Sequence, residues 1–361
     1  MNISVTTEAG VNTSEAAPLD SFIHYRVAIW LISYVTPIIV ILGTFGNVMT
    51  IVIMRRTATG DSVTNIFFTA LAVTDLISLY GTAFTFWTRY TFDFNLAALS
   101  SASCKLHAWI STGSGTVGAW ILVLLTVHRA TAVVWPHRVN VLCTRRKAWL
   151  AVGVITVLLA ALYSHYIYGF DLHPRRNSSR FVCYYVSAEY LHFVDSVFTY
   201  IEMLIFCAGP FSCLALSNSV LVWKLTVSVR EARQRLTSGN TEQFETRNKA
   251  ANSVTLTVIM VSLTFIILTL PNGVYFVVFI ALVDDQTRSG LAKGYLYYMT
   301  MSLLLFCNMA VNFYLYCLTG RRFRQEFYNI ITCGRSEATV NSSSHRNQPS
   351  ASTSTGTTGI N

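Results

Sequence analysis

The sequence predicts an all-α membrane protein: a seven-transmembrane helix bundle followed by a short membrane-surface eighth helix. The 361 residues are 53% hydrophobic and only 12% charged, against roughly 25% charged for an ordinary soluble domain. A helix needs about 20 largely apolar residues to cross a bilayer, and seven runs meet that length. They fill most of the chain, which leaves no room for a separate soluble domain: 27–54, 62–88, 106–127, 148–170, 196–223, 250–283 and 294–320.

The loop charges orient this bundle. Seven spans place the termini on opposite sides of the membrane, and cytoplasmic loops carry the excess of Lys and Arg. Of the 26 Lys and Arg residues, 18 lie on the side of the carboxyl end. We therefore expect a multi-pass plasma-membrane protein with an extracellular amino end. Because this bias accounts for the net charge of +9, no nucleic acid is expected as a partner.

Four segments are expected along the chain. Residues 1–26 form a polar extracellular tail with no features of a cleavable signal peptide. Residues 27–320 form the bundle. Residues 321–333 are predicted to form an amphipathic helix along anionic lipid, and the Ser- and Thr-rich residues 334–361 a disordered cytoplasmic tail.

Several covalent modifications are predicted from this topology. Glycosylation sequons fall on the outer side at Asn2, Asn12 and Asn177. On the inner side, Cys333 follows the amphipathic segment and is a candidate for palmitoylation, with a free thiol as the alternative.

A disulfide is predicted on the outer face. Of the eight cysteines, only Cys104 and Cys183 lie in outer segments, where the environment is oxidising. Their pairing ties the outer end of the third span to the loop after the fourth. Within that loop, residues 180–186 are rich in β-branched and aromatic side chains, which predicts a short extracellular hairpin over a central cavity.

Ionisable residues inside a span are costly and normally face the bundle interior or a wet cavity. Asp75, with Asn47, Asn308 and Asn312 at comparable depth, predicts a site for a small cation or a water network; a protonated, hydrogen-bonded Asp75 is the alternative. Glu202 lies about two turns, roughly 10 Å, inside the fifth span. It is a candidate counter-charge for a basic ligand, the alternative being an internal pair with Lys105, His107, Arg89 or Arg180.

Short motifs recur in a fixed order along most of the chain. They are Gly46-Asn47, Leu71-Ala72-x-x-Asp75, Cys104 standing 25 residues before Arg129, Trp149, Pro210, Phe265, Pro271, Asn312-x-x-x-Tyr316, Phe323 and Phe327. In order and spacing, this set resembles the rhodopsin-like (class A) G-protein-coupled receptor family.

The resemblance implies a receptor whose ligand opens an inner cleft for a heterotrimeric G protein. The sixth helix, which contains Pro271, would tilt outward. Arg129 would contact the G protein and Tyr316 would swing inward, while the site at Asp75 and Asn312 would hold sodium and water. Arrestin and a receptor kinase are further implied partners. No set of residues with catalytic or metal-ligand spacing is found, so neither an enzyme nor a further cofactor is expected.

Six positions depart from the family pattern, one of which is Ala130, in place of the tyrosine after the arginine. Together they predict weakened inactive-state restraints and measurable ligand-independent signalling. The other five are His128 before the arginine, Asn218 in the fifth helix, Ala251 at the inner end of the sixth, Thr269 in place of tryptophan, and Phe313 in place of proline.

The ligand class follows from comparison with the family. Ser111 replaces the aspartate of amine receptors and Phe306 the retinal-linking lysine of photopigments. The predicted outer hairpin, and segments similar to those of invertebrate neuropeptide receptors, favour a neuropeptide. A chemosensory receptor for a small molecule is the alternative, with a transporter or channel less favoured. The expected pocket residues are His107, Ser111, Glu202, Asn272, Phe276, Tyr298 and Ser302.

Overall fold

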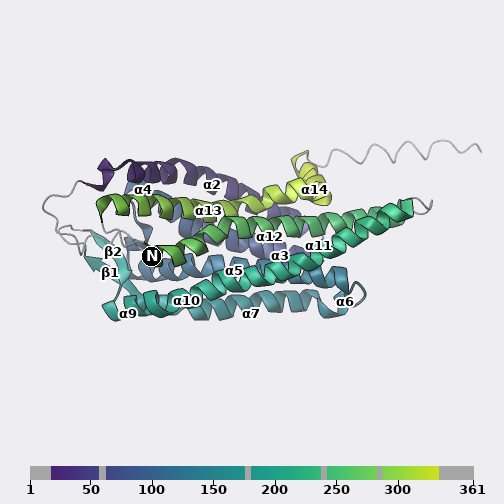
Figure 1. Cartoon of the computed structure of the whole chain (residues 1–361), viewed down its shortest axis with the longest axis horizontal. Helices are drawn as coiled ribbons and strands as arrows, with labels where there is room; N and C mark the ends of the chain where they lie inside the picture. Colours follow the sequence, from purple (N-terminus) through teal and green to yellow (C-terminus); the bar gives the residue numbers. More distant parts are fainter. Residues whose placement is uncertain (1–17, 57–61, 175–179, 237–241, 283–286, 333–361) are drawn as a thin grey trace, which may run out of the picture.

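The computed structural model describes residues 18–56, 62–174, 180–236, 242–282 and 287–332. Within these ranges, side chains are not described at 62, 140, 231–236, 242–251 and 274–282. The described part is a bundle of long helices, with a small β-sheet at one end and α14 (Arg321–Ile331) at the other (Figure 1). Asn2, Asn12, Asn177 and Cys333 lie outside the described residues.

Within the described residues, seven helices are long and apolar enough to cross a membrane, which confirms the predicted bundle. Several are built from consecutive segments, some of them π-helical. The spans comprise α2 (Ile23–Arg56); α3 (Ser62–Ser78), η2 (Leu79–Phe84) and α4 (Thr85–Phe92); α5 (Ser101–Val134); α7 (Arg145–Tyr163) and α8 (His165–Gly169); α9 (Ala188–Phe193), η4 (Val194–Phe198), α10 (Thr199–Glu202), η5 (Met203–Ala208) and α11 (Gly209–Leu236); α12 (Glu242–Leu282); and α13 (Arg288–Thr319). Short helical turns occur at η1 (Leu19–Ser21), η3 (Leu96–Ala98) and α6 (Val139–Leu142).

The fifth span extends farther outward than predicted. It begins at Ala188 rather than at residue 196, because Ser187 caps it by accepting a hydrogen bond from the backbone N–H of Tyr190. Hydropathy detects the apolar stretch, whereas the cap sets where the helix begins. Glu202 therefore lies about 20 Å along the helix from its start. The prediction that it lies only about two turns inside the fifth span was wrong.

Two antiparallel strands close one end of the bundle, which the loop charges predict to be the outer end. In this hairpin β1 (Phe170–Pro174) pairs with β2 (Phe181–Tyr185), and Leu172 lies opposite Cys183. A hairpin is present as predicted, but the predicted residues 180–186 supply only its second strand. The fourth span was predicted to reach residue 170, but Phe170 begins β1, because an apolar run alone does not separate a helix end from a strand.

The hairpin is attached to the third span at two points. The predicted disulfide between Cys104 and Cys183 is confirmed, with their Cα atoms 5.4 Å apart. Beside it, the Lys105 ammonium lies 3.3 Å from the Asp171 carboxylate. Hydrogen bonds from Ser101 and from the backbone N–H of Leu172, together with Lys105, lower the pKa of Asp171 to about 2. This carboxylate therefore stays ionised at neutral pH, and the pair weakens only as the pH falls toward 2.

Aromatic packing joins the first span, the seventh span and the surface helix at the inner end. The buried Phe313 ring of α13 lies 5.7 Å from Phe45, 5.6 Å from Phe323 and 5.2 Å from Phe327, between ring centroids. A Cβ atom at Gly46 would lie 2.8 Å from the Cβ of Phe313, so only glycine fits there. The residue that replaces the family's proline thus anchors α14.

Candidate functional site

A cavity of about 340 Å³ opens beneath the hairpin and reaches the middle of the bundle. Cys183 and Tyr185 of β2 line its outer part, and Asp75 and Asn312 line its deep part. Ligand pockets in proteins are of this size, roughly 300–1,000 Å³. The disulfide and the Lys105–Asp171 pair hold the hairpin over this space.

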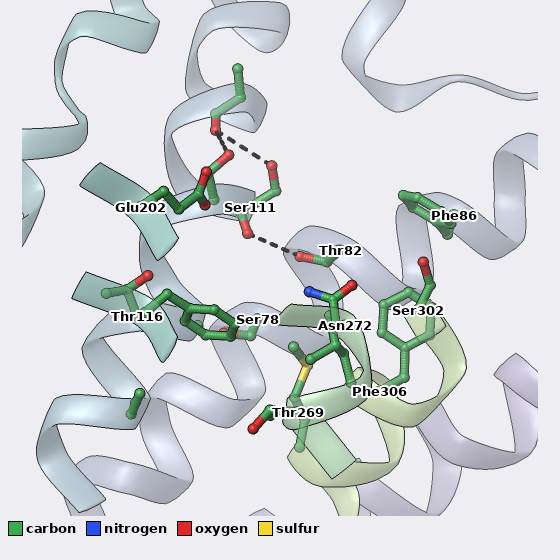
Figure 2. A pocket seen from close by; sticks show the side chains of 18 of the residues that line it. Ser78, Thr82, Phe86, Ser111, Thr116, Glu202, Thr269, Asn272, Ser302 and Phe306 are labelled. Carbon is green, nitrogen blue, oxygen red and sulfur yellow. Dashed lines mark hydrogen bonds between the residues drawn. The ribbon is translucent and has the colours of Figure 1, made fainter. Parts of the chain in front are cut away.

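Six of the seven predicted pocket residues line the cavity. Figure 2 shows four of them, Ser111, Glu202, Asn272 and Ser302, around the same space. The side chain of Phe276 lies outside the described residues. The six that line the cavity are His107, Ser111, Glu202, Asn272, Tyr298 and Ser302.

Glu202 contributes a carboxylate to the cavity wall, between the π-helical segments η4 and η5. Single π-helical turns often occur at functional sites because they rotate the following side chains. Asp195, one residue into η4, lines the same cavity. Asp195 was not predicted, although its spacing of seven residues from Glu202, two helical turns, was a usable signal.

Glu202 forms no ion pair with any side chain of the described residues. The four bases considered as internal partners have contacts elsewhere. The Lys105 ammonium pairs with Asp171, the Arg180 guanidinium pairs with Asp93, the His107 ring lies 3.1 Å from the Thr85 hydroxyl, and the Arg89 guanidinium lies 5.6 Å from the Tyr90 ring centre. The internal-pair alternative therefore finds no support in the geometry.

The deep end of the cavity is polar. The side-chain amide of Asn312 donates a 2.7 Å hydrogen bond to the Asp75 carboxylate, and both residues are buried. Asn308 lines the cavity beside them. Three of the four polar residues predicted at this depth thus line the same cavity. Asn47 instead donates to the backbone carbonyl of Met309, at 2.9 Å.

Thr269 helps to explain why one cavity reaches so deep. It occupies the place of the tryptophan in the family pattern, and its hydroxyl donates to the backbone carbonyl of Phe265, at 2.6 Å. This small, buried side chain lines the cavity (Figure 2). The cavity therefore continues from the hairpin to Asp75. A larger side chain at Thr269 would narrow it.

At the inner end, the buried Arg129 guanidinium donates a hydrogen bond to the hydroxyl of Thr64, on α3. Tyr316 is also buried, with ring centroids 4.6 Å from Phe68 and 5.4 Å from Phe323. Pro271 lies in α12, next to the cavity-lining Asn272. The contact with Thr64 was not predicted, since it depends on how α3 meets α5.

A match to a known family model identifies the family to which this helix bundle belongs. The model of the family described as "7 transmembrane receptor (rhodopsin family)" matches residues 46–316, from the Gly46-Asn47 motif within the first span to Tyr316 near the end of the seventh. The chain belongs to this family. The receptor is therefore similar in fold and motif order to the rhodopsin-like receptors, as its sequence indicated.

Three similar proteins are receptors with peptide names. The receptor is 27% identical to a bombesin receptor of Bombina orientalis over 343 residues, 91% of this chain and 82% of that protein. It is 27% identical to bombesin receptor subtype-3 of Ovis aries over 324 residues, 85% and 77% of the two chains. It is 24% identical to neurotensin receptor type 1 of Rattus norvegicus over 355 residues, 92% and 81% of the two chains.

Proposed function

We propose that this receptor binds an extracellular neuropeptide beneath the hairpin and activates a heterotrimeric G protein at the inner end of the bundle. The single observation that carries the ligand proposal is Glu202, a cavity carboxylate with no cation partner among the described residues. The similarity to bombesin and neurotensin receptors supports a peptide. The charge bias of the loops supports an extracellular amino end at the plasma membrane.

The chemistry of the cavity favours a ligand with a basic group. Glu202, Asp195 and Asp75 supply three carboxylates to its lining, against the bases Arg89 and His107. A carboxylate withdrawn from water without a partner is unfavourable, so a ligand cation that pairs with it stabilises the complex. The rings of Phe86, Phe306 and Tyr298, which line the same cavity, suit apolar peptide side chains.

Replacing Glu202 with glutamine tests this proposal. We expect the potency of an activating peptide to fall about 10- to 100-fold, because a charge-assisted hydrogen bond is lost while the shape is kept. The measurement is a dose-response curve for G-protein activation in transfected cells, using the most active of a panel of bombesin- and neurotensin-type peptides. A peptide analogue with its basic residue neutralised should lose nothing further in the variant.

Glu189→Gln is the matched control. Glu189 lies in the first turn of the same span, is exposed, and does not line the cavity. Both variants are compared at equal surface expression. An unaltered dose-response curve for Glu202→Gln, or an equal loss for Glu189→Gln, would remove Glu202 from the ligand site.

For the inner end, we propose that Arg129, Tyr316 and Pro271 serve activation. Arg129 and Tyr316 are both buried, so a G protein meets them only after the bundle opens, and the helix containing Pro271 is the one expected to move. Arrestin, a receptor kinase and anionic lipid along α14 are the further partners expected of a receptor in this family.

We also propose that Asp75, Asn308 and Asn312 hold a sodium ion. Carboxylate and amide oxygens are hard donors of the kind that hard cations prefer, and the three side chains line the cavity where Asp75 and Asn312 are buried. A bound cation supplies the counter-charge that a carboxylate needs inside a membrane. We expect Asp75→Asn to abolish the dependence of peptide potency on sodium, measured against choline chloride at equal ionic strength. A sodium effect of unchanged size would contradict the site.

A further inference from the structure

Asn272 places an amide group in the central cavity without a partner from the bundle. It lies on α12, one residue after Pro271, and is only 8% exposed. Its side chain lines the cavity, and the amide points into the open space (Figure 2). Among the described residues, this amide forms no hydrogen bond. A buried amide without a hydrogen bond is unfavourable, so a ligand group that pairs with it is bound more tightly.

Other polar side chains of the same lining already have partners. The Thr269 hydroxyl, one turn before Asn272 on α12, donates to the Phe265 carbonyl at 2.6 Å. The Ser302 hydroxyl on α13 donates to the Tyr298 carbonyl at 2.9 Å. These two hydroxyls are used within their own helices, whereas the donor and the acceptor of Asn272 are both available to a ligand.

The amide of Asn272 sets a strict requirement for its partner, because it presents a carbonyl acceptor beside an N–H donor. An ammonium group would pair only with the acceptor, and a carboxylate only with the donor. In a trans peptide unit the N–H and the C=O point in opposite directions, so one such unit cannot pair with both. A primary carboxamide carries an N–H and a C=O on the same side and can pair with both at once.

The charge and the size of the cavity agree with a neutral group of this kind. Glu202, Asp195 and Asp75 bring three carboxylates to the lining, against the bases Arg89 and His107. A carboxylate on the ligand would add a further negative charge, and a carboxamide adds none. The volume of about 340 Å³ is near the lower end for ligand pockets, so the cavity holds a chain end or a side chain rather than a loop of the peptide.

We propose that Asn272 recognises a primary carboxamide of the peptide ligand through a pair of hydrogen bonds, one donated and one accepted. Two parts of a peptide carry this group, an amidated carboxyl end and the side chain of Asn or Gln, and the experiment below distinguishes them. The inference rests on the proposed function. It adds to the basic group expected at Glu202 a second, neutral group that the ligand must carry.

Peptides that differ only in their carboxamides test this inference. Each peptide of the bombesin- and neurotensin-type panel is made as the primary carboxamide, the N-methylamide and the free acid, and G-protein activation is measured in transfected cells. We expect the primary carboxamide to be about tenfold more potent than the N-methylamide, the effect of one lost hydrogen bond, and the free acid to be weaker still. In a second arm, each Asn or Gln of the primary carboxamide is replaced by Leu. A tenfold loss in that arm, with equal potency of the amide forms, would assign the carboxamide to the side chain.

Asn272→Leu keeps the volume of the side chain and removes both hydrogen-bonding groups. We expect this variant to respond equally to the peptide forms that the wild-type receptor distinguishes by the carboxamide. Asn272→Ser gives the same readout if Asn272→Leu does not reach the cell surface. Thr269→Val is the matched control, because it changes a cavity hydroxyl that is already bonded to its own helix. It should keep the tenfold preference.

Three results would overturn the inference while leaving the proposed function intact. They are equal potencies across both arms in the wild-type receptor, a free acid more potent than the carboxamide, and a preference that persists in the Asn272 variants or disappears equally in Thr269→Val. Each of them requires a peptide that activates the receptor. If no peptide activates it in any form, the proposed function fails and the inference fails with it.

Discussion

Replacing Phe313 with alanine is expected to lower the stability of the folded receptor by about 3–5 kcal/mol, the cost usual for removing a buried Phe side chain. Lipid is as apolar as a protein interior, so the loss comes from packing rather than from exposure to water. The void would lie where α2, α13 and α14 meet, because the Phe313 ring contacts Phe45, Phe323 and Phe327 there. Thermal unfolding in detergent should show a midpoint about 10 °C lower.

Phe45→Ala is the comparison for this change. Phe45 belongs to the same cluster, but its side chain is 48% exposed on the outside of the bundle. Lipid therefore replaces much of its surroundings, and its loss should shift the midpoint far less. Midpoints that fall by the same amount in both variants would show that Phe313 does not anchor α14.

Replacing Thr64 with valine is expected to raise ligand-independent signalling about tenfold. The change keeps the shape of the side chain and removes the hydroxyl that accepts the Arg129 hydrogen bond. A hydrogen bond to a charged group is worth about 1.5–3 kcal/mol, and losing about 1.4 kcal/mol from one of two states shifts their ratio tenfold. The bond holds Arg129 in the buried arrangement, so its loss favours the open one.

The measurement is basal G-protein activation, normalised to surface expression. Thr126→Val is the matched control, because Thr126 is fully buried on α5 and its hydroxyl bonds only within its own helix, to the Leu122 carbonyl. Basal activity that stays at the wild-type level in Thr64→Val, or that rises equally in Thr126→Val, would show that Thr64 does not restrain Arg129.

The seven spans follow from composition, and Glu202 follows from it too, because an ionisable residue within an apolar run is expected to face the interior. Glu202 lines the cavity, and so do Asn272 and Ser302, which were expected there from the comparison with the family. Asp195 escaped this reasoning, because hydropathy placed the start of the fifth span one residue after it, whereas Ser187 caps the helix earlier.

The rest depends on how elements meet in space. The Arg129–Thr64 contact joins residues 65 positions apart, and a threonine at that distance carries no local pattern. The π-helical segments η2, η4 and η5 likewise left no periodic signal in the sequence. Phe313 was noted as a departure from the family pattern. Its packing role becomes clear only from the structure, in which it lies directly beside Gly46.

The most direct test of the receptor's function is G-protein activation in transfected cells across a broad neuropeptide panel, with Arg129→Ala measured in parallel. We expect at least one peptide with a basic residue to activate the wild-type receptor, and expect Arg129→Ala to lose that activation while it still binds the peptide at the cell surface. No response to any peptide in cells where Thr64→Val signals from the surface would contradict a peptide ligand. Activation that persists in Arg129→Ala would contradict the proposed coupling site.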